Sequence, residues 1–152
     1  MSRKQRKILA VASGGGHWVQ LRRVIPAFDG GAVTYVTINP TYKTDVPGEN
    51  IFIVRDSTRW DKVGMMLLSL EILWIMIRVR PHVVISTGAA PGCLAIILGR
   101  FLGAKTIWLD SIANVEEMSM SGQLVRKFSS LWLTQWPHLE ADEGPEYAGR
   151  VF

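Results

Sequence analysis

The feature that most constrains the fold is a short apolar run that stops at a cluster of glycines near the N-terminus. Residues 7–12 read Lys-Ile-Leu-Ala-Val-Ala, and residues 13–17 read Ser-Gly-Gly-Gly-His. A continuous apolar run of this length is typical of a parallel strand that is buried on both faces. The glycines allow a tight turn, and apolar residues at helical spacing then predict a helix over about 18–28. The chain therefore begins with a buried strand, a glycine loop and a helix.

The rest of the chain alternates short strands with longer helical segments. Further strands are expected at 32–38, 51–54, 82–87, 105–110 and 131–135, and further helices at 60–79, 93–102 and 123–129. Strands alternating with such helices form βαβ units, which build a parallel sheet with helices on both faces. A chain of 152 residues, 48% of them hydrophobic, has the size of one compact domain. The predicted fold class is thus α/β, a single Rossmann-like parallel-sheet lobe over residues 1–152.

The net charge of the chain indicates that its partners are anionic. The formal net charge is +4 and the isoelectric point is near 9.5, which suits an anionic membrane surface or nucleic acid. Proteins that bind single-stranded nucleic acid carry exposed aromatic residues among their basic ones. Here Trp74, Trp108 and Trp132 lie inside hydrophobic runs, where core packing is expected. Nucleic acid is therefore not expected as a partner.

The N-terminal segment, residues 1–7, is basic and reads Met-Ser-Arg-Lys-Gln-Arg-Lys. It lacks the apolar stretch and the small-residue cleavage pattern of a secretory signal. Cys93 is the single cysteine, so no intrachain disulfide is possible and a reducing compartment fits. A cytoplasmic location is expected.

The longest apolar stretch, Val63 to Ile77, contains 15 residues and is interrupted by Glu71. A membrane-spanning helix needs about 20 residues, so a spanning helix is not expected. As a helix the stretch is apolar nearly all round, and protein or lipid must cover it.

The loop after the first strand is the first candidate site, and it consists of Ser13, Gly14, Gly15, Gly16 and His17. Unhindered backbone N–H groups and a helix N-terminus can bind an anion there, and a diphosphate is the expected ligand. The alternative is that the glycines only make a tight turn.

Two common nucleotide motifs do not fit this loop. A dinucleotide fingerprint needs a third glycine where Val19 stands, and an acidic residue at the end of the second strand, where residues 37–39 read Thr-Ile-Asn. No Gly-Lys-Ser/Thr follows the glycines, which excludes a P-loop. No cofactor is expected.

His17 and Asp110 are the candidate proton acceptors. The unperturbed pKa of a histidine lies near neutrality, so His17 can bind a phosphate or a sugar hydroxyl, or take a proton from it. Asp110 ends a strand, where its carboxylate can accept a proton from an acceptor hydroxyl. The alternatives are a structural histidine and an aspartate that caps the following turn.

Ser86, Thr87 and Gly88 end another strand and form a second, less specific candidate anion site. The three histidines and the one cysteine are scattered and show no metal-ligand spacing, so no metal is expected.

Four segments together resemble a known family. They are the glycine loop, Ser86-Thr87-Gly88, the stretch from Asp110 to Val115 with Ser-Met-Ser-Gly at 119–122, and Gln-Trp-Pro-His-Leu at 135–139. The chain resembles the membrane-associated subunit of the two-subunit transferase that adds the second N-acetylglucosamine to dolichyl-diphosphate-N-acetylglucosamine. Bacterial relatives in polysaccharide synthesis share these motifs.

The resemblance implies the N-terminal half of a GT-B glycosyltransferase that inverts the anomeric centre and uses no metal. It implies a separate small subunit that supplies the C-terminal lobe with the nucleotide-sugar site. This chain would then hold a lipid-diphosphate-sugar acceptor, with Ser111 and Asn114 in the acceptor site, at the cytoplasmic face of a membrane as a peripheral or monotopic protein. The alternative is a scaffold that does no chemistry and only recruits and activates a catalytic partner.

The sequence departs from the family pattern at two points, and these departures limit which residue roles and which mode of membrane attachment the resemblance implies. Family members commonly have a glutamate in place of Asp110 and an arginine in place of Asn114, so the contact of that arginine has no counterpart here. Eukaryotic members also have an N-terminal membrane span, where this chain has a basic heptapeptide. Attachment is therefore expected through the apolar helix and through Lys and Arg contacts.

Overall fold

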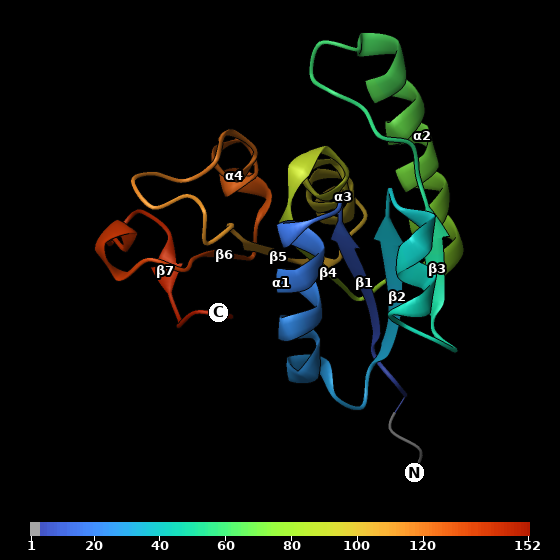
Figure 1. The fold of residues 1–152 in the computed structure, drawn as a ribbon, viewed down its shortest axis with the longest axis horizontal. Coiled ribbons are helices and arrows are strands. Elements are labelled where there is room, and N and C mark those ends of the chain that lie inside the picture. Colours follow the sequence, from blue (N-terminus) through green and yellow to red (C-terminus); the bar gives the residue numbers. More distant parts are fainter. Residues whose placement is uncertain (1–3) are drawn as a thin grey trace.

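The computed structural model describes residues 4–152, so Arg3 of the basic N-terminal segment lies outside the described residues. Its centre is a seven-stranded sheet in the order β3-β2-β1-β4-β5-β6-β7, and every pair of neighbouring strands is parallel (Figure 1). The strands are β1 (Lys7–Ala12), β2 (Ala32–Thr37), β3 (Asn50–Ile53), β4 (Val83–Gly88), β5 (Lys105–Leu109), β6 (Leu131–Thr134) and β7 (Glu146–Tyr147). The predicted α/β class with one parallel sheet is confirmed.

Within residues 4–152, four α-helices and four 3-10 helices connect these strands. The α-helices are α1 (Gly16–Val24), α2 (Lys62–Val79), α3 (Ala89–Phe101) and α4 (Met120–Leu124). The 3-10 helices are η1 (Ile25–Phe28), η2 (Pro40–Thr44), η3 (Arg126–Phe128) and η4 (Pro137–Leu139).

Strand β1 lies inside the sheet, and its side chains alternate between two layers of core. Leu9 and Val11 point to the face that α2 and α3 cover, whereas Ile8, Ala10 and Ala12 point to the face that α1 covers. This follows from the alternation of side chains along a strand. Burial on both faces explains why residues 8–12 form a continuous apolar run.

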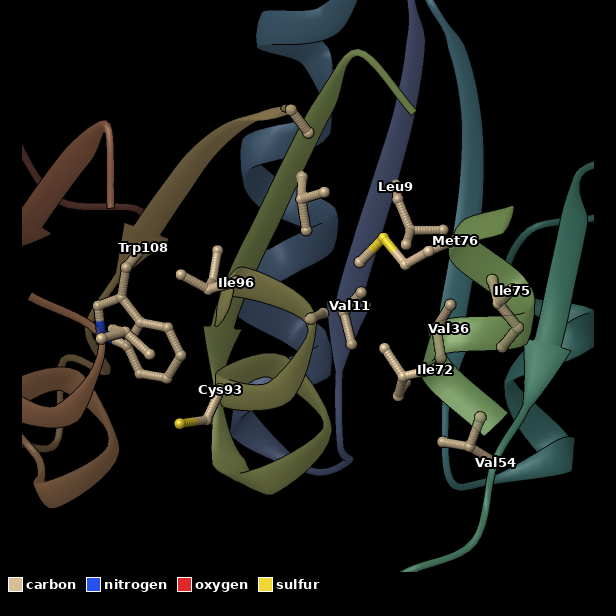
Figure 2. Packing of buried hydrophobic residues seen from close by; sticks show 14 of the residues in the cluster. Leu9, Val11, Val36, Val54, Ile72, Ile75, Met76, Cys93, Ile96 and Trp108 are labelled. Carbon is tan, nitrogen blue, oxygen red and sulfur yellow. The ribbon is translucent and has the colours of Figure 1, made fainter. Parts of the chain in front are cut away.

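The larger of the two layers lies between the sheet and the helices α2 and α3. Figure 2 shows Leu9 and Val11 facing Met76 and Ile72 of α2, with Ile96 of α3 farther along the same layer. Trp108 of β5 is fully buried at the far side of this layer. The layer therefore holds both helices against the same face of the sheet.

Helix α2 lies within the range expected for it, and its ends have identifiable causes. The Asp61 carboxylate caps the first turn by accepting a hydrogen bond from the Gly64 N–H at 2.9 Å. At the other end Arg80 adopts a left-handed conformation and Pro81 follows. The helix runs antiparallel to the strands, and its first turns rise beyond the carboxyl ends of β1 and β2 (Figure 1). Within residues 4–152 no helix combines the length and the apolarity needed to cross a bilayer.

Three helix starts differ from the expectation. Helix α1 begins at Gly16 rather than at residue 18, and α3 begins at Ala89, directly after β4, rather than at residue 93. The Gly-Ala-Ala-Pro-Gly stretch at residues 88–92 does not delay the start of the helix. Pro91 lies in the first turn of α3, where its missing N–H costs nothing. The helix expected at 123–129 is α4 followed by the separate turn η3, because the Ser119 hydroxyl caps an earlier start.

Candidate functional site

The carboxyl ends of the strands bring the two glycine-containing loops together. Ala12 at the end of β1 pairs with Gly88 at the end of β4. His17 and Thr87 then join the loops with two hydrogen bonds. The His17 Nδ1 donates to the Thr87 carbonyl at 2.9 Å, and the Thr87 hydroxyl donates to the His17 carbonyl at 2.6 Å.

The bond to Thr87 fixes which ring nitrogen of His17 can act as a base. A carbonyl oxygen only accepts hydrogen bonds, so Nδ1 must carry the hydrogen. In the neutral imidazole the other nitrogen, Nε2, then has a free lone pair. His17 is only partly buried, and this geometry suits the transfer of a proton to Nε2.

Gly88 makes the approach of the His17 ring possible. A Cβ atom at position 88 would lie 2.2 Å from the His17 Nδ1, and the φ of Gly88 is 146°, which L side chains rarely adopt. The preceding residues Ser86 and Thr87 are fully buried, and the Ser86 Oγ accepts a hydrogen bond from the Gly88 N–H at 3.1 Å. Their side chains therefore shape the loop, and a ligand contact from them stays a prediction.

The first glycine loop has a conformation that requires glycine. Gly15 has φ 57° and ψ −131°, and its N–H donates to the Tyr42 hydroxyl at 2.8 Å. Gly16, His17 and Trp18 form the first turn of α1, whose N–H groups have no acceptor inside the helix. Ser13 is buried beneath the loop, and its carbonyl accepts a hydrogen bond from the Thr37 hydroxyl at 2.5 Å. The open amides of the first turn of α1 are the groups that can bind an anion.

Asp110 is 2% exposed, and each of its carboxylate oxygens accepts two hydrogen bonds from β5 or from the loop that follows it. Oδ1 accepts hydrogen bonds from the Trp108 indole at 3.0 Å and from the Ser119 hydroxyl at 2.6 Å. Oδ2 accepts from the Asn114 amide at 3.1 Å and from the Ser119 N–H at 2.8 Å. A Cβ atom added to Gly122 would lie 2.8 Å from Oδ1, so the loop packs closely over the carboxylate. These contacts favour the structural alternative, in which Asp110 organises the loop, over direct proton transfer.

Two buried glutamines fix the Asp110 loop against α1, namely Gln135 of the Gln-Trp-Pro motif and Gln20, which no sequence motif indicated. The Gln20 amide donates to the Ser111 hydroxyl at 3.2 Å, and its oxygen accepts from the Ile112 N–H at 3.1 Å. The Gln135 amide donates to the Asp110 carbonyl at 3.0 Å and also to the Gln20 oxygen. Glutamines 115 positions apart carry no local pattern, so only the fold reveals their contact.

The described residues offer no alternative centre of metal or thiol chemistry. No group of three or more His, Cys, Asp or Glu side chains among residues 4–152 could hold a metal ion. Burial raises the pKa of the Cys93 thiol from 9.0 to about 11, so the reactive thiolate is disfavoured at neutral pH. Cys93 is instead a residue of α3 that packs in the core (Figure 2).

Comparisons with known proteins agree with this architecture. The family model described as "Oligosaccharide biosynthesis protein Alg14 like" matches residues 54–151. Two curated relatives are UDP-N-acetylglucosamine transferase subunits ALG14. The mouse protein is 32% identical over 51% of this chain and 39% of its own length, and the human protein is 32% identical over 62% of this chain and 46% of its own length. The matched part of the chain thus spans less than half of either relative.

Among solved structures, MurG of Acinetobacter baumannii has a TM-score of 0.76 at 12% identity, over 94% of this chain and 45% of its own. UDP-N-acetylglucosamine 2-epimerase of Rickettsia bellii has a TM-score of 0.72 at 13% identity, over 97% of this chain and 45% of its own. At such identities the likeness establishes the fold. This chain therefore has the fold of one lobe of a GT-B protein, as the sequence predicts.

Proposed function

The chain belongs to the Alg14-like family of oligosaccharide biosynthesis proteins, and on this premise we propose that it is the acceptor-binding, membrane-associating subunit of a two-component inverting glycosyltransferase. The reaction moves a sugar from a nucleotide-sugar to a hydroxyl of a lipid-diphosphate-linked sugar and needs no metal. The names of the curated relatives support N-acetylglucosamine as the transferred sugar.

The observation that carries this proposal is the position of His17. Its ring is held by the Thr87 carbonyl at the carboxyl edge of the sheet, beside the open amides of the first turn of α1. An acceptor whose diphosphate binds those amides, along the loop of Ser13 and glycines 14–16, brings its sugar hydroxyl to the same edge.

In the proposed reaction the acceptor hydroxyl oxygen attacks the anomeric carbon of the donor sugar. A new C–O bond forms, the bond from that carbon to the nucleoside diphosphate breaks, and the hydroxyl proton moves to the His17 Nε2. The hydrogen bond from Nδ1 to the Thr87 carbonyl stabilises the resulting imidazolium. Asp110 acts through the loop that it holds, in which the Asn114 amide donates to its carboxylate and the Ser111 hydroxyl accepts from the Ala113 N–H, so that acceptor contacts from Ser111 and Asn114 stay a prediction. Direct proton transfer to Asp110 is the alternative.

The nucleotide-sugar is proposed to bind to a separate small subunit. The curated relatives are named subunits of a UDP-N-acetylglucosamine transferase, which supports a second polypeptide in the enzyme. The partner then supplies the C-terminal lobe and closes the site over the carboxyl edge.

Attachment to the cytoplasmic face of a membrane is proposed to run through α2. Five of its large apolar side chains are exposed at helical spacing, namely Val63, Met66, Leu70, Trp74 and Ile77. We call them the α2 stripe. Exposed cations flank both of its ends, with Arg59 and Lys62 at one end and Arg78 and Arg80 at the other. This pattern suits a helix that lies in the surface of an anionic membrane.

The α2 stripe also favours a second candidate function, a scaffold that recruits a catalytic partner to the membrane without chemistry of its own. The two functions predict different effects of a substitution at the site on turnover. A His17 variant that assembles normally and loses turnover supports the enzyme subunit, whereas full turnover in assembled variants of both His17 and Asp110 supports the scaffold.

The proposed function is tested by measuring the transfer of N-acetylglucosamine to polyprenyl-diphosphate-N-acetylglucosamine. The chain is assayed alone and after co-expression with a small protein that carries the pattern of a C-terminal GT-B lobe. Transfer is expected only from the co-expressed pair. Robust transfer by the lone chain would contradict the two-component proposal, and no transfer by an assembled pair would contradict the activity itself.

A further inference from the structure

We infer that Tyr42 is a further acceptor-binding residue, whose hydroxyl donates a hydrogen bond to the diphosphate at the glycine loop. This inference rests on the proposed function, because the diphosphate belongs to the proposed acceptor. Neither the sequence motifs nor the family resemblance includes Tyr42.

Tyr42 reaches the glycine loop from the turn η2, which follows β2. The Asn39 side chain begins this turn by accepting a hydrogen bond from the Thr41 N–H at 3.0 Å, and Pro40 occupies its first position. The Tyr42 hydroxyl then accepts the Gly15 N–H at 2.8 Å. It also lies 3.5 Å from where a Cβ atom of Gly14 would be, so the phenol forms one wall of the loop.

The aromatic ring of Tyr42 is held in place by a fixed neighbour. It stacks on the Trp18 indole with ring centroids 4.8 Å apart and an angle of 4° between the planes. Trp18 is itself buried, and its indole N–H donates to the Asp45 carboxylate at 2.9 Å. The hydroxyl therefore keeps its position without a ligand, which lowers the entropic cost of binding one.

The Tyr42 hydroxyl has a hydrogen left to donate. A phenol can both accept and donate, and the bond from Gly15 uses only an acceptor position. Among residues 4–152 no protein acceptor takes the hydroxyl hydrogen. The bond that it receives from the Gly15 N–H also polarises the O–H group and makes it a better donor.

A diphosphate supplies the acceptor that this hydroxyl lacks. Gly15 gives its own N–H to Tyr42, so that amide is not available to the ligand. Tyr42 replaces it with an O–H donor that lies beside Gly14 and Gly15. Hydrogen bonds to charged oxygens are the stronger ones, so the loss of this donor weakens the binding of a diphosphate more than that of an uncharged ligand.

The first experiment measures the binding of geranyl diphosphate to the purified full chain by calorimetry. Tyr42→Phe keeps the ring that stacks on Trp18 and removes only the hydroxyl. We expect it to bind about tenfold more weakly than the wild type. Tyr147→Phe is the matched control, because Tyr147 lies in β7 at the opposite edge of the sheet from β3, and it should bind as the wild type does. Equal binding by Tyr42→Phe and wild type overturns the inference, and so does undetectable binding by the wild type.

A second measurement separates a ligand contact from mere support of the loop. In the assembled pair, Tyr42→Phe should raise KM for the lipid-diphosphate acceptor about tenfold, with kcat and KM for the nucleotide-sugar within about twofold of the wild type. If Tyr42 only supported the loop, its loss would also displace His17 and lower kcat. A fall in kcat of about tenfold would therefore overturn the contact between Tyr42 and the diphosphate. If the assembled wild-type pair transfers no sugar, the proposed function fails, whereas the geranyl diphosphate experiment still decides the role of Tyr42.

Discussion

The His17 imidazole reaches its place through residues that are distant in sequence. Its ring lies where a Cβ atom of Gly88 would be, and its Nδ1 donates to the carbonyl of Thr87, 70 positions away. The strand, the glycine loop and the histidine could be predicted because they form one local pattern. The partner of the histidine could not, because the pairing of β1 with β4 alone determines it.

Replacement of His17 by alanine tests whether this side chain accepts the proton of the acceptor hydroxyl. His17→Ala should fold and bind the partner, since a partly buried side chain loses one hydrogen bond, worth about 1 kcal/mol. Turnover in the assembled pair should fall about 10²-fold or more, because the hydroxyl loses its proton acceptor. Steady-state kinetics and thermal unfolding measure both effects.

His82→Ala is the matched control, because His82 lies directly before β4, at the end of the strand opposite the carboxyl edge. Its Nδ1 accepts a hydrogen bond from the Lys7 N–H there. It should retain wild-type kinetics. A loss confined to acceptor KM in His17→Ala would indicate a positioning role. Unchanged kinetics in a folded, partner-bound His17→Ala would remove His17 from the site and leave Asp110 as the alternative.

At the scale of elements, α2 is the helix whose sequence and structure agree most closely. Its apolar residues extend nearly around the helix, which predicted that protein or lipid covers it. The structure divides them, with Leu68, Ile72, Ile75 and Met76 in the core and the α2 stripe exposed. An apolar helix without a clear polar face does not reveal from its sequence alone which side is buried, so this division required the fold.

A charge placed in the α2 stripe should weaken membrane attachment. Leu70 is 56% exposed within the stripe, and Leu124→Glu provides a matched control at a leucine of α4 that is 61% exposed. Leu70→Glu should lower partitioning onto anionic vesicles about tenfold, because one apolar side chain leaves the bilayer and a like charge enters it. Vesicle sedimentation at low and high salt measures the effect, and salt should weaken the binding of all variants. Equal binding by the two variants would contradict the role of α2.

At the scale of the whole molecule, buried polar contacts join the first helix to the last strands. Gln20 of α1 and Gln135 after β6 hydrogen-bond each other, and the Gln135 oxygen accepts the Val151 N–H at 3.0 Å. The parallel sheet could be predicted from the alternation of strands and helices. The short strand β7 could not, because the Glu146 and Tyr147 pair carries no apolar pattern of its own.

Removal of the Gln135 amide should destabilise the whole fold. Gln135→Leu leaves the Asp110 carbonyl and the Val151 N–H without their partner, at a cost of about 2 kcal/mol. Urea unfolding followed by circular dichroism measures the change. Gln5→Leu, at an exposed glutamine outside the sheet, should stay within about 0.5 kcal/mol of the wild type. A Gln135 variant as stable as the Gln5 variant would mean that the buried contacts are not needed for stability.

The order of the strands has a consequence for how the chain is made on the ribosome. Of the strands in residues 4–152, β1 is synthesised first and lies inside the sheet, with β2 and β3 added on one side and β4 to β7 on the other. Each newly synthesised strand therefore joins an edge of the sheet that already exists, and no strand has to be inserted between two that are paired. The sheet can thus grow in the order of translation, and no earlier pairing needs to open for a later one.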